Sequence, residues 1–233
     1  MTLPLPHLMF ERRIHALIAG LALLVVGASL AVMVAVTGSR SVVQAVDDRW
    51  LEWMGAIRTP WIIRTAKTLS VVGSPLVIVP LRLFVIVMLA VRRRWLQLGA
   101  FIAATICSEL CIGPLKALID RPRPPGGLIE TSSSSFPSGH AVAASATAIG
   151  LMIVLVPAAG RRAHWTVIAS TFAIVMAMSR TNLSVHWASD VIAGGCLGTG
   201  FAVVWPAALE LERERRRVAT AQQATTSRDL ATR

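Results

Sequence analysis

Residues 16–37 read ALIAGLALLVVGASLAVMVAVT and contain no charged side chain. An α-helix needs about 20 apolar residues to cross the hydrocarbon core of a bilayer, so this stretch predicts a transmembrane helix. Arg12 and Arg13 precede it. The stretch is too long for the apolar core of a signal peptide and no convincing cleavage site follows, so we expect it to be retained.

Five more apolar stretches follow, over residues 71–91, 95–115, 141–160, 163–179 and 191–209. With the first stretch they predict an all-α integral membrane bundle of six transmembrane helices within one domain, residues 1–210. The last stretch contains Gly194-x-x-x-Gly198, a spacing that lets another helix approach closely. Residues 211–233 are polar and Arg-rich, and we expect them to form a disordered cytoplasmic tail.

Composition excludes several classes of protein. Hydrophobic residues make up 55% of the chain and charged residues 15%, whereas soluble domains carry about 25% charged residues. A soluble enzyme and a disordered chain are therefore excluded. The three cysteines lie inside apolar stretches and match neither zinc nor disulfide spacing, which excludes a disulfide scaffold; they are Cys107, Cys111 and Cys196.

The formal net charge of +11 is concentrated in basic runs that flank apolar stretches. Such runs mark the cytoplasmic ends of membrane helices. The runs at Arg92–Arg94 and Arg161–Arg162, together with the Arg-rich tail, place both termini in the cytoplasm and residues 116–140 outside. Nucleic-acid binding needs stacking aromatics on a basic face, but the chain has no Tyr. We therefore expect no nucleic-acid partner.

Two features of the predicted bundle concern single residues. Residues 39–70 hold Trp50, Trp53 and Trp61, which predicts a helical segment lying in the membrane interface. Arg82 and Glu109 interrupt neighbouring apolar stretches. Because a charged side chain inside the membrane needs a partner, we expect these two to pair.

Three motif blocks fall at the predicted outer ends of the helices. They are Lys116-x6-Arg123-Pro124, Pro137-Ser138-Gly139-His140 and Ser179-Arg180-x5-His186-x3-Asp190. Each block alone is compatible with an ordinary turn, an interfacial histidine or a snorkelling arginine. Their order and their matched depth in the membrane together indicate one site.

The third block suggests an oriented imidazole. His186 and Asp190 are four residues apart and share one face of a helix. Asp190 can accept a hydrogen bond from one ring nitrogen of His186 and leave the other with a free lone pair. Such an imidazole can act as a nucleophile, a general base or a metal ligand. The sequence shows no cluster that completes a metal site.

The other blocks suggest an anion site. Gly139 and His140 begin a helix after a Ser-rich loop, and a helix N-terminus attracts anions. Gly139 lets the backbone approach a ligand, and Ser138 adds a hydroxyl. Three cations converge there from separate blocks: Lys116, Arg123 and Arg180. This set suits a phosphoryl group in transfer.

The three blocks resemble the signature of the type 2 phosphatidic acid phosphatase superfamily, which includes vanadium-dependent haloperoxidases. Every specified position of that signature is met over residues 116–190. The resemblance implies that His186 is the nucleophile and forms a phosphohistidine, that Asp190 orients it, and that His140 protonates the leaving oxygen and then activates water. It also implies that the phosphoryl oxygens are held by Lys116, Arg123, Arg180, Ser138 and the N–H of Gly139, with no metal or other cofactor.

These expectations describe a phosphatase of the inner membrane with its site on the extracytoplasmic face. Its substrate would be a lipid in the bilayer, either a polyprenyl diphosphate or a glycerophospholipid phosphate. No obligate protein partner is expected. Two alternatives stay open: a lipid phosphotransferase with the same site, and a transporter of a phosphate-bearing solute. A haloperoxidase is disfavoured because members of the superfamily with that activity are soluble.

Overall fold

The computed structural model describes residues 6–37, 41–157 and 162–231 of the chain. Within these ranges all regular structure is helical, with eight helices and no strand, which confirms the all-α prediction. The helices are α1 (Pro6–Thr37), α2 (Val42–Ala56), α3 (Pro60–Val72), α4 (Pro75–Val91), α5 (Trp95–Ile119), α6 (Gly139–Leu155), α7 (Arg162–Asn182) and α8 (Ala188–Ala231).

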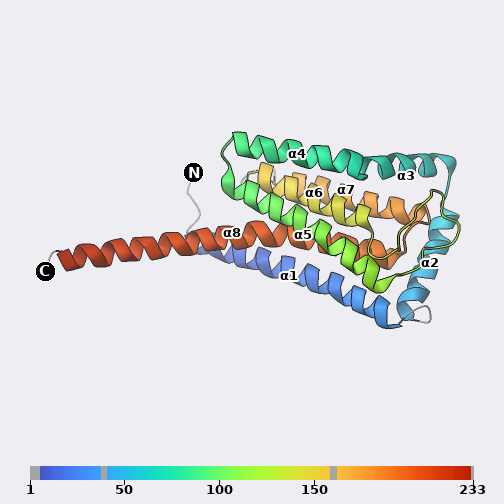
Figure 1. Ribbon diagram of the computed structural model, residues 1–233, viewed down its shortest axis with the longest axis horizontal. Helices are drawn as coiled ribbons and strands as arrows, with labels where there is room; N and C mark the ends of the chain where they lie inside the picture. Colours follow the sequence, from blue (N-terminus) through green and yellow to red (C-terminus); the bar gives the residue numbers. More distant parts are fainter. Residues whose placement is uncertain (1–5, 38–40, 158–161, 232–233) are drawn as a thin grey trace.

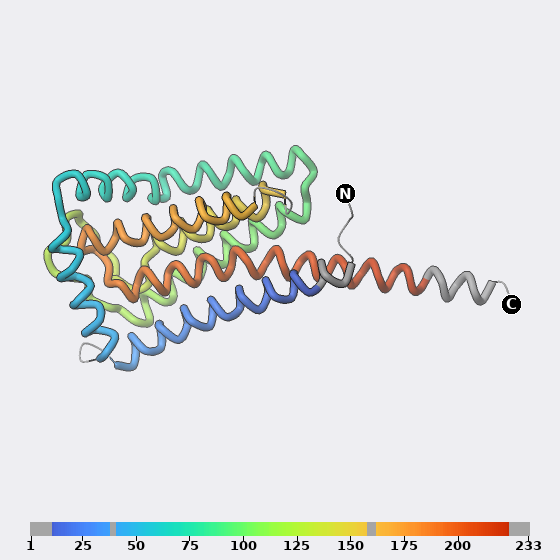
Figure 2. The backbone as a smooth tube through the Cα atoms, turned by 180° about the vertical axis from the view of Figure 1, so that it is seen from behind, coloured from blue at the N-terminus to red at the C-terminus, as the bar shows by residue number. Residues whose placement is uncertain are grey.

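The long helices run side by side along the long axis of the molecule (Figure 1). Helix α2 crosses one end of this bundle and connects α1 to α3, as the view from behind also shows (Figure 2). Helices α3 and α4 follow one another with a bend of 47°. The predicted helix over residues 71–91 therefore begins at Pro75, because proline lacks an N–H and favours the first helical position.

Three helices, α1, α5 and α8, contain spans that are long and apolar enough to cross a membrane, and the bent pair α3–α4 makes a possible fourth. Helix α6 is apolar but has 17 residues, fewer than the about 20 that a span usually needs. Helix α6 ends at Leu155, before Pro157, whereas the predicted apolar stretch covers residues 141–160. Residues 158–160 of that stretch lie outside the described residues. Six long helices are thus present, although six crossings do not follow from their length and composition.

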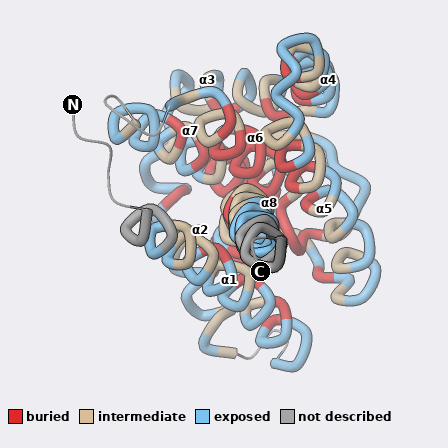
Figure 3. The backbone as a smooth tube through the Cα atoms, turned by 90° about the vertical axis from the view of Figure 1, so that its left-hand side faces the viewer, coloured by how far each residue is buried: buried red, intermediate tan, exposed pale blue. Residues whose placement is uncertain are grey.

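The centre of the bundle is built from small residues. Buried positions concentrate around α6, while the outward faces of α1 and α4 are exposed (Figure 3). A Cβ added to Gly198 on α8 would lie 2.3 Å from the carbonyl oxygen of Val142 on α6, and one on Gly194 would lie 2.9 Å from that of Ser138. The Gly194-x-x-x-Gly198 spacing therefore does bring α6 and α8 into close contact, as the sequence predicts.

The predicted pair of Arg82 and Glu109 is also present, with Arg82 buried and Glu109 half exposed. Arg82 Nη1 of α4 lies 2.6 Å from Glu109 Oε1 of α5. Arg82 Nε also donates to Thr147 Oγ1 of α6 at 2.8 Å, and Arg82 Nη2 donates to the carbonyl oxygen of Ala143 at 3.3 Å. One arginine thus connects three helices.

The C-terminal segment differs from the disordered tail expected over residues 211–233. Helix α8 continues to Ala231 and projects beyond the bundle (Figure 1). Ion pairs support this extension: Arg13 of α1 contacts Glu210 at 3.0 Å and Glu214 at 3.8 Å, and Glu212 pairs with Arg216 one turn later at 2.7 Å. Pairs of opposite charge spaced by four residues stabilise exposed helices.

Candidate active site

All three motif blocks lie at the end of the bundle that α2 crosses. Lys116 is in the last turn of α5, and Arg123 follows in the loop before α6. Ser138, Gly139 and His140 begin α6. The last block spans the C-terminus of α7 with Arg180, the following loop with His186 and the first turn of α8 with Asp190. Side chains from four helices and two loops therefore meet at one end of the molecule.

His186 lies between a carboxylate and a guanidinium. Its Nδ1 atom is 3.5 Å from Asp190 Oδ2, which is ion-pair distance but too long for a well-formed hydrogen bond. Its Nε2 atom is 3.3 Å from Nη1 of Arg123. Because arginine can only donate, this contact assigns the proton of a neutral His186 to Nδ1. The lone pair of Nε2 then faces the side of the site where the cation Arg123 lies.

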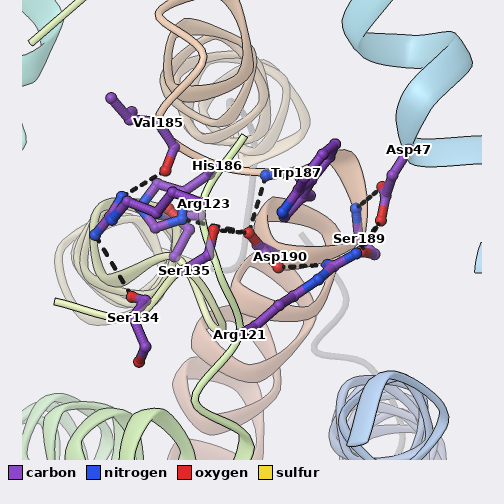
Figure 4. Close-up of polar contacts among 12 residues, drawn as sticks. Asp47, Arg121, Arg123, Ser134, Ser135, Val185, His186, Trp187, Ser189 and Asp190 are labelled. Atoms are coloured by element: carbon purple, nitrogen blue, oxygen red, sulfur yellow. Dashed lines mark hydrogen bonds and ion pairs between the residues drawn. The ribbon is translucent and has the colours of Figure 1, made fainter. Parts of the chain in front are cut away.

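Asp190 is completely buried, and both of its carboxylate oxygens accept hydrogen bonds (Figure 4). Its Oδ2 atom accepts hydrogen bonds from Ser135 Oγ and from the backbone N–H of Trp187. Its Oδ1 atom accepts a 2.8 Å bond from Arg121. The backbone carbonyl of Asp190 also accepts from the N–H of Ser138 at 3.2 Å. The carboxylate that faces His186 is therefore held from several directions.

Burial lowers the pKa of two site residues that lie in loops, His186 and Arg123. Burial lowers the pKa of His186 to about 4; Asp190 opposes this shift, while Arg123 and Arg180 add to it. The imidazole is therefore neutral at neutral pH and keeps its lone pair. Burial also lowers the pKa of Arg123 from its usual value, and Asp190 counteracts this.

The cations Lys116 and Arg123 are anchored by the Ser-rich loop. Lys116 Nζ donates to the carbonyl oxygen of Ser134, whose hydroxyl returns a 3.0 Å bond to the carbonyl of Lys116. Arg123 Nε donates to the carbonyl of Ser133 at 2.7 Å, and Arg123 Nη1 donates to the carbonyl of Val185. The low-complexity run of serines is thus an ordered frame for two of the three cations.

His140 and Arg180 meet at Ser70, the third-last residue of α3. His140 Nε2 donates to the carbonyl oxygen of Ser70 at 3.0 Å, and Arg180 Nη1 donates to the hydroxyl of Ser70 at 2.5 Å. The Nε atom of Arg180 is buried and makes no hydrogen bond to the described residues. The nitrogen of His140 that stays available for proton transfer is Nδ1.

Ser138 and Gly139 form the start of α6. Ser138 caps the helix and accepts a 3.4 Å bond from the N–H of Ala141. A Cβ at Gly139 would lie 3.9 Å from Ile112, an ordinary contact. The surrounding protein thus leaves space beside Gly139, and the free N–H groups of this helix start point to the end of the bundle that holds the cations.

Sequence reasoning missed a second buried ion pair behind the site. Arg121 Nη1 donates to Asp190 and to Ser189 Oγ, while Arg121 Nη2 lies 2.7 Å from Asp47 Oδ2 on α2. Asp47 in turn accepts from the N–H and the hydroxyl of Ser189, at 2.8 and 2.6 Å. Arg121 stands two positions before Arg123 and repeats its Arg-Pro pattern, which is a usable signal. Asp47 gives no local signal, because it is 143 residues from Asp190 in the chain (190 − 47).

The hydrogen-bond donors of the site are mostly cationic. Among the described residues, no group of three or more His, Cys, Asp or Glu side chains is arranged to hold a metal ion. Lys116, Arg123, Arg180 and the N-terminus of α6 instead offer hydrogen-bond donors and positive charge. This arrangement can bind a tetrahedral oxyanion beside Nε2 of His186.

Comparisons with known proteins show what this chain is similar to. The family model of the PAP2 superfamily matches residues 97–213. Phosphatidylglycerophosphatase B of Bacillus subtilis (strain 168) is 29% identical over 165 residues, which are 67% of this chain and 79% of that protein.

Two solved structures share the fold. The crystal structure of a transmembrane PAP2 type phosphatidylglycerolphosphate phosphatase from Bacillus subtilis superposes with a TM-score of 0.69 and 25% identity, over 80% of this chain and 93% of that one. LpxE of Aquifex aeolicus superposes with a TM-score of 0.56 and 23% identity, over 66% of this chain and 91% of that one. The second likeness concerns the fold alone.

Proposed function

This chain belongs to the PAP2 superfamily, and from that premise we propose that it hydrolyses a lipid phosphate through a phosphohistidine on His186. It is an integral membrane protein with long apolar helices, similar to a transmembrane phosphatase. One observation carries the proposal: neutral His186 directs its Nε2 lone pair toward Arg123 while Nδ1 faces the buried Asp190.

The first step transfers the phosphoryl group to the protein. Nε2 of His186 attacks phosphorus, the bond from phosphorus to the lipid oxygen breaks, and the imidazolium form of His140 donates its Nδ1 proton to that oxygen. Arg123, Lys116 and Arg180 neutralise the equatorial oxygens together with the N–H groups at the start of α6. Asp190 stabilises the imidazolium character that develops on His186.

The second step releases inorganic phosphate. His140, now without its proton, takes one from a water molecule, and the resulting hydroxide attacks phosphorus. The bond between phosphorus and Nε2 breaks, and His186 returns to its neutral form. Water enters from the opposite side to the departing nitrogen, so that His140 serves both steps from the face on which the lipid alcohol left.

The substrate that we propose is a glycerophospholipid phosphate, with polyprenyl diphosphate as the second candidate. An apolar cavity of about 460 Å³ borders the first turn of α8, where Ala188 and Val191 flank Asp190 in the sequence. Trp50, Ile149 and Ile174 also line it. An acyl chain that enters laterally between helices can occupy this cavity while its phosphate reaches His186.

We also propose six crossings of the inner membrane, with both termini in the cytoplasm and the site on the extracytoplasmic face. The structure supports this topology because the Arg92–Arg94 turn lies at the end of the bundle opposite α2 and the site (Figure 1). Helix α6, with 17 residues, would count as a short span, and α7 has 21 residues. Their outward ends bear His140 and Arg180.

Phosphate release by the purified protein tests this function. We expect release from phosphatidylglycerol phosphate, phosphatidic acid or polyprenyl diphosphate in the presence of EDTA, inhibition by vanadate, and complete loss in His186→Ala. Loss of activity in EDTA that magnesium restores would contradict the proposed charge neutralisation by side chains. Release that persists in His186→Ala would contradict the nucleophile.

A further inference from the structure

The end of α3 contacts two of the proposed site residues, although it belongs to none of the three motif blocks. Helix α3 packs along α7 at the end of the bundle that holds the site (Figure 1). Its last turn, from Ser70 to the C-cap residue Gly73, meets Arg180 of α7 and His140 of α6. We call residues 70–73 the α3 C-terminal turn. Because it contacts both partners, this turn can influence the reaction without meeting the substrate.

Arg180 differs from the other buried arginines in having no carboxylate partner. The buried arginines of the described chain are Arg82, Arg121 and Arg180, and the first two form ion pairs. Arg180 is 2% exposed, and its side chain makes one hydrogen bond to the described residues, from Nη1 to the hydroxyl of Ser70 at 2.5 Å. The hydroxyl of Ser70 therefore fixes the guanidinium without neutralising it, which leaves the charge and the other N–H groups for an anionic ligand.

Ser70 also holds His140, through its backbone. The N–H of Ser74, which would close the next helical turn on Ser70, donates instead to the carbonyl of Val71 at 3.1 Å. The last carbonyls of a helix need partners from outside it, and the carbonyl of Ser70 accepts from His140 Nε2 at 3.0 Å. Gly73 lies against the same ring, since a Cβ there would be 2.9 Å from His140 Cδ2. The α3 C-terminal turn therefore sets the position of this imidazole.

We propose that Ser70 is a positioning residue of the reaction and acts through two different groups. Its hydroxyl holds the guanidinium of Arg180 where the phosphoryl oxygens bind. Its carbonyl holds neutral His140 with a proton on Nε2, so that Nδ1 is the atom that exchanges the transferred proton. This inference rests on the proposed function, which gives Arg180 and His140 those tasks. Displacing a catalytic group by about 1 Å can lower a rate about 10²-fold, so one turn of α3 can control both.

Ser70→Ala tests the hydroxyl, because it removes the bond to Arg180 and leaves the carbonyl for His140. Arg180 contacts the phosphoryl oxygens whatever the leaving group is. We therefore expect kcat/KM to fall about ten- to a hundredfold for phosphatidic acid and for p-nitrophenyl phosphate alike, as for the loss of one charge-assisted hydrogen bond.

Vanadate binding to the full chain in detergent gives a readout that needs no turnover. Vanadate resembles five-coordinate phosphorus, so its dissociation constant in isothermal titration calorimetry should rise in Ser70→Ala by a factor similar to the loss in kcat/KM. A purely structural role would lower the number of binding sites, through loss of folded protein, and leave the affinity unchanged. Ser70→Thr keeps the hydroxyl and should restore most of the affinity.

Gly73→Ala tests the contact with His140. The φ of −84° at Gly73 suits alanine, but the added methyl group would lie 2.9 Å from Cδ2 of His140 and displace the ring. The loss in kcat/KM should then be larger for phosphatidic acid than for p-nitrophenyl phosphate, because only the lipid alkoxide needs the proton. Ser74→Ala is the matched control: its hydroxyl donates to the carbonyl of Val71 at 2.7 Å on the exposed side, and its loss should change neither constant.

Two results for Ser70→Ala would overturn the inference. One is wild-type affinity for vanadate together with wild-type kcat/KM. The other is a loss confined to phosphatidic acid, which would mean that the hydroxyl serves His140 and not Arg180. Wild-type protein that binds vanadate but releases no phosphate would refute the proposed hydrolysis alone, since weaker binding in Ser70→Ala would still show that Ser70 positions Arg180. Wild-type protein that does not bind vanadate would refute both.

Discussion

At the residue scale, the two histidines of the site differ in which ring nitrogen is free. His186 presents Nε2 beside Arg123, with Nδ1 directed at Asp190. His140 donates from Nε2 to the carbonyl oxygen of Ser70, which leaves Nδ1 free for proton transfer. The first arrangement suits a nucleophile backed by a carboxylate, and the second suits a group that carries a proton to and from the reacting oxygen.

This division of roles predicts that the effect of His140→Ala depends on the leaving group. A lipid alkoxide leaves poorly without a proton, so turnover of phosphatidic acid should fall about 10²–10⁴-fold. Nitrophenolate leaves without protonation, so phosphorylation of His186 by p-nitrophenyl phosphate should be much less affected. Dephosphorylation would still be slow, because His140 also activates water. Rapid-mixing kinetics should then show a burst of nitrophenol, with phosphate trapped on the protein.

The same experiment has an outcome that contradicts the assignment. If both leaving groups suffer equal losses, without a burst and without trapped phosphate, His140 is not the acid. His186→Ala provides the control, since it should abolish both the burst and the trapped phosphate.

The ion pair behind Asp190 predicts a role for Asp47 in positioning the catalytic carboxylate. Asp47→Asn removes one of two anionic partners of the buried Arg121. Breaking a buried pair costs about 3 kcal/mol, so the melting temperature should fall. The kcat should also fall at temperatures well below the melting point, with little change in KM, because Arg121 no longer holds Asp190 in one orientation.

Asp48→Asn is the matched control for this prediction, since Asp48 is the exposed neighbour that contacts Gln44. It should change neither quantity. A variant Asp47→Asn that is less stable but has wild-type kcat would show that Asp47 supports the fold without positioning Asp190.

Burial of His186 predicts an acid-sensitive component of stability. Its pKa is lowered to about 4 in the folded protein, against about 6.5 for an unfolded chain. Between these values the unfolded state binds a proton that the folded state does not, so the free energy of unfolding decreases as pH falls from about 6.5 to about 4. The melting temperature in detergent should drop less over this window in His186→Gln than in wild type. His164→Gln, which changes an exposed histidine of α7, should behave like wild type; equal drops in all three proteins would count against the shift.

At the scale of the elements, the helices meet through small residues and one buried arginine. Gly198 lets α8 approach the backbone of α6, and Arg82 joins α4, α5 and α6. Close packing of small residues is how helices associate where lipid removes the hydrophobic driving force between them. The active-site end of α6 is positioned by these contacts, because Ala143 and Thr147 follow His140 by one and two turns.

The Arg82–Glu109 pair predicts non-additive stabilities. An unpaired charge within a span costs about 2.5–3.5 kcal/mol on insertion scales, so Glu109→Gln should lower the melting temperature in detergent. Arg82→Leu in that background should restore part of the loss, because it removes the unpaired cation. A double-mutant cycle should give a coupling of about 0.5–3 kcal/mol. Additive effects would show that the contact contributes nothing to stability.

At the scale of the whole molecule, the basic runs and the proposed active site lie at opposite ends of the bundle. The basic turn at Arg92–Arg94 and the projecting Arg-rich part of α8 lie away from α2 and the site (Figure 2). Basic residues favour the cytoplasmic side. This polarity supports the proposed placement of the site on the extracytoplasmic face, at the end where α2 covers the long helices.

This polarity predicts the outcome of reporter fusions. Fusions at Arg94, at Gly160 and at the C-terminus should report the cytoplasm, and a fusion within residues 125–133 should report the outside. Gly160 lies outside the described residues, so that fusion tests the sequence-based topology independently of the structure. A periplasmic signal from the C-terminal fusion would reverse the side on which the chemistry takes place.

The sequence by itself determined the helical class, the apolar stretches and the eight residues proposed for catalysis and phosphate binding. These features are local. Hydropathy over about 20 residues reports whether a segment can span a bilayer. His186 and Asp190 are close, as predicted, but the predicted shared helix face was wrong, because His186 lies in the loop before α8. The Gly194-x-x-x-Gly198 contact and the Arg82–Glu109 pair were predictable for similar reasons, since membrane burial requires close packing and paired charges.

Only the tertiary structure decided how that site is supported. Asp47 is hydrogen-bonded to Ser189, which lies 142 positions later in the sequence, and Ser70 is hydrogen-bonded to Arg180, 110 positions later. No spacing rule connects residues so far apart in sequence; their contact depends on where α2 and α3 pack over the bundle. Local pattern thus determines which groups react, and packing determines what holds them in place.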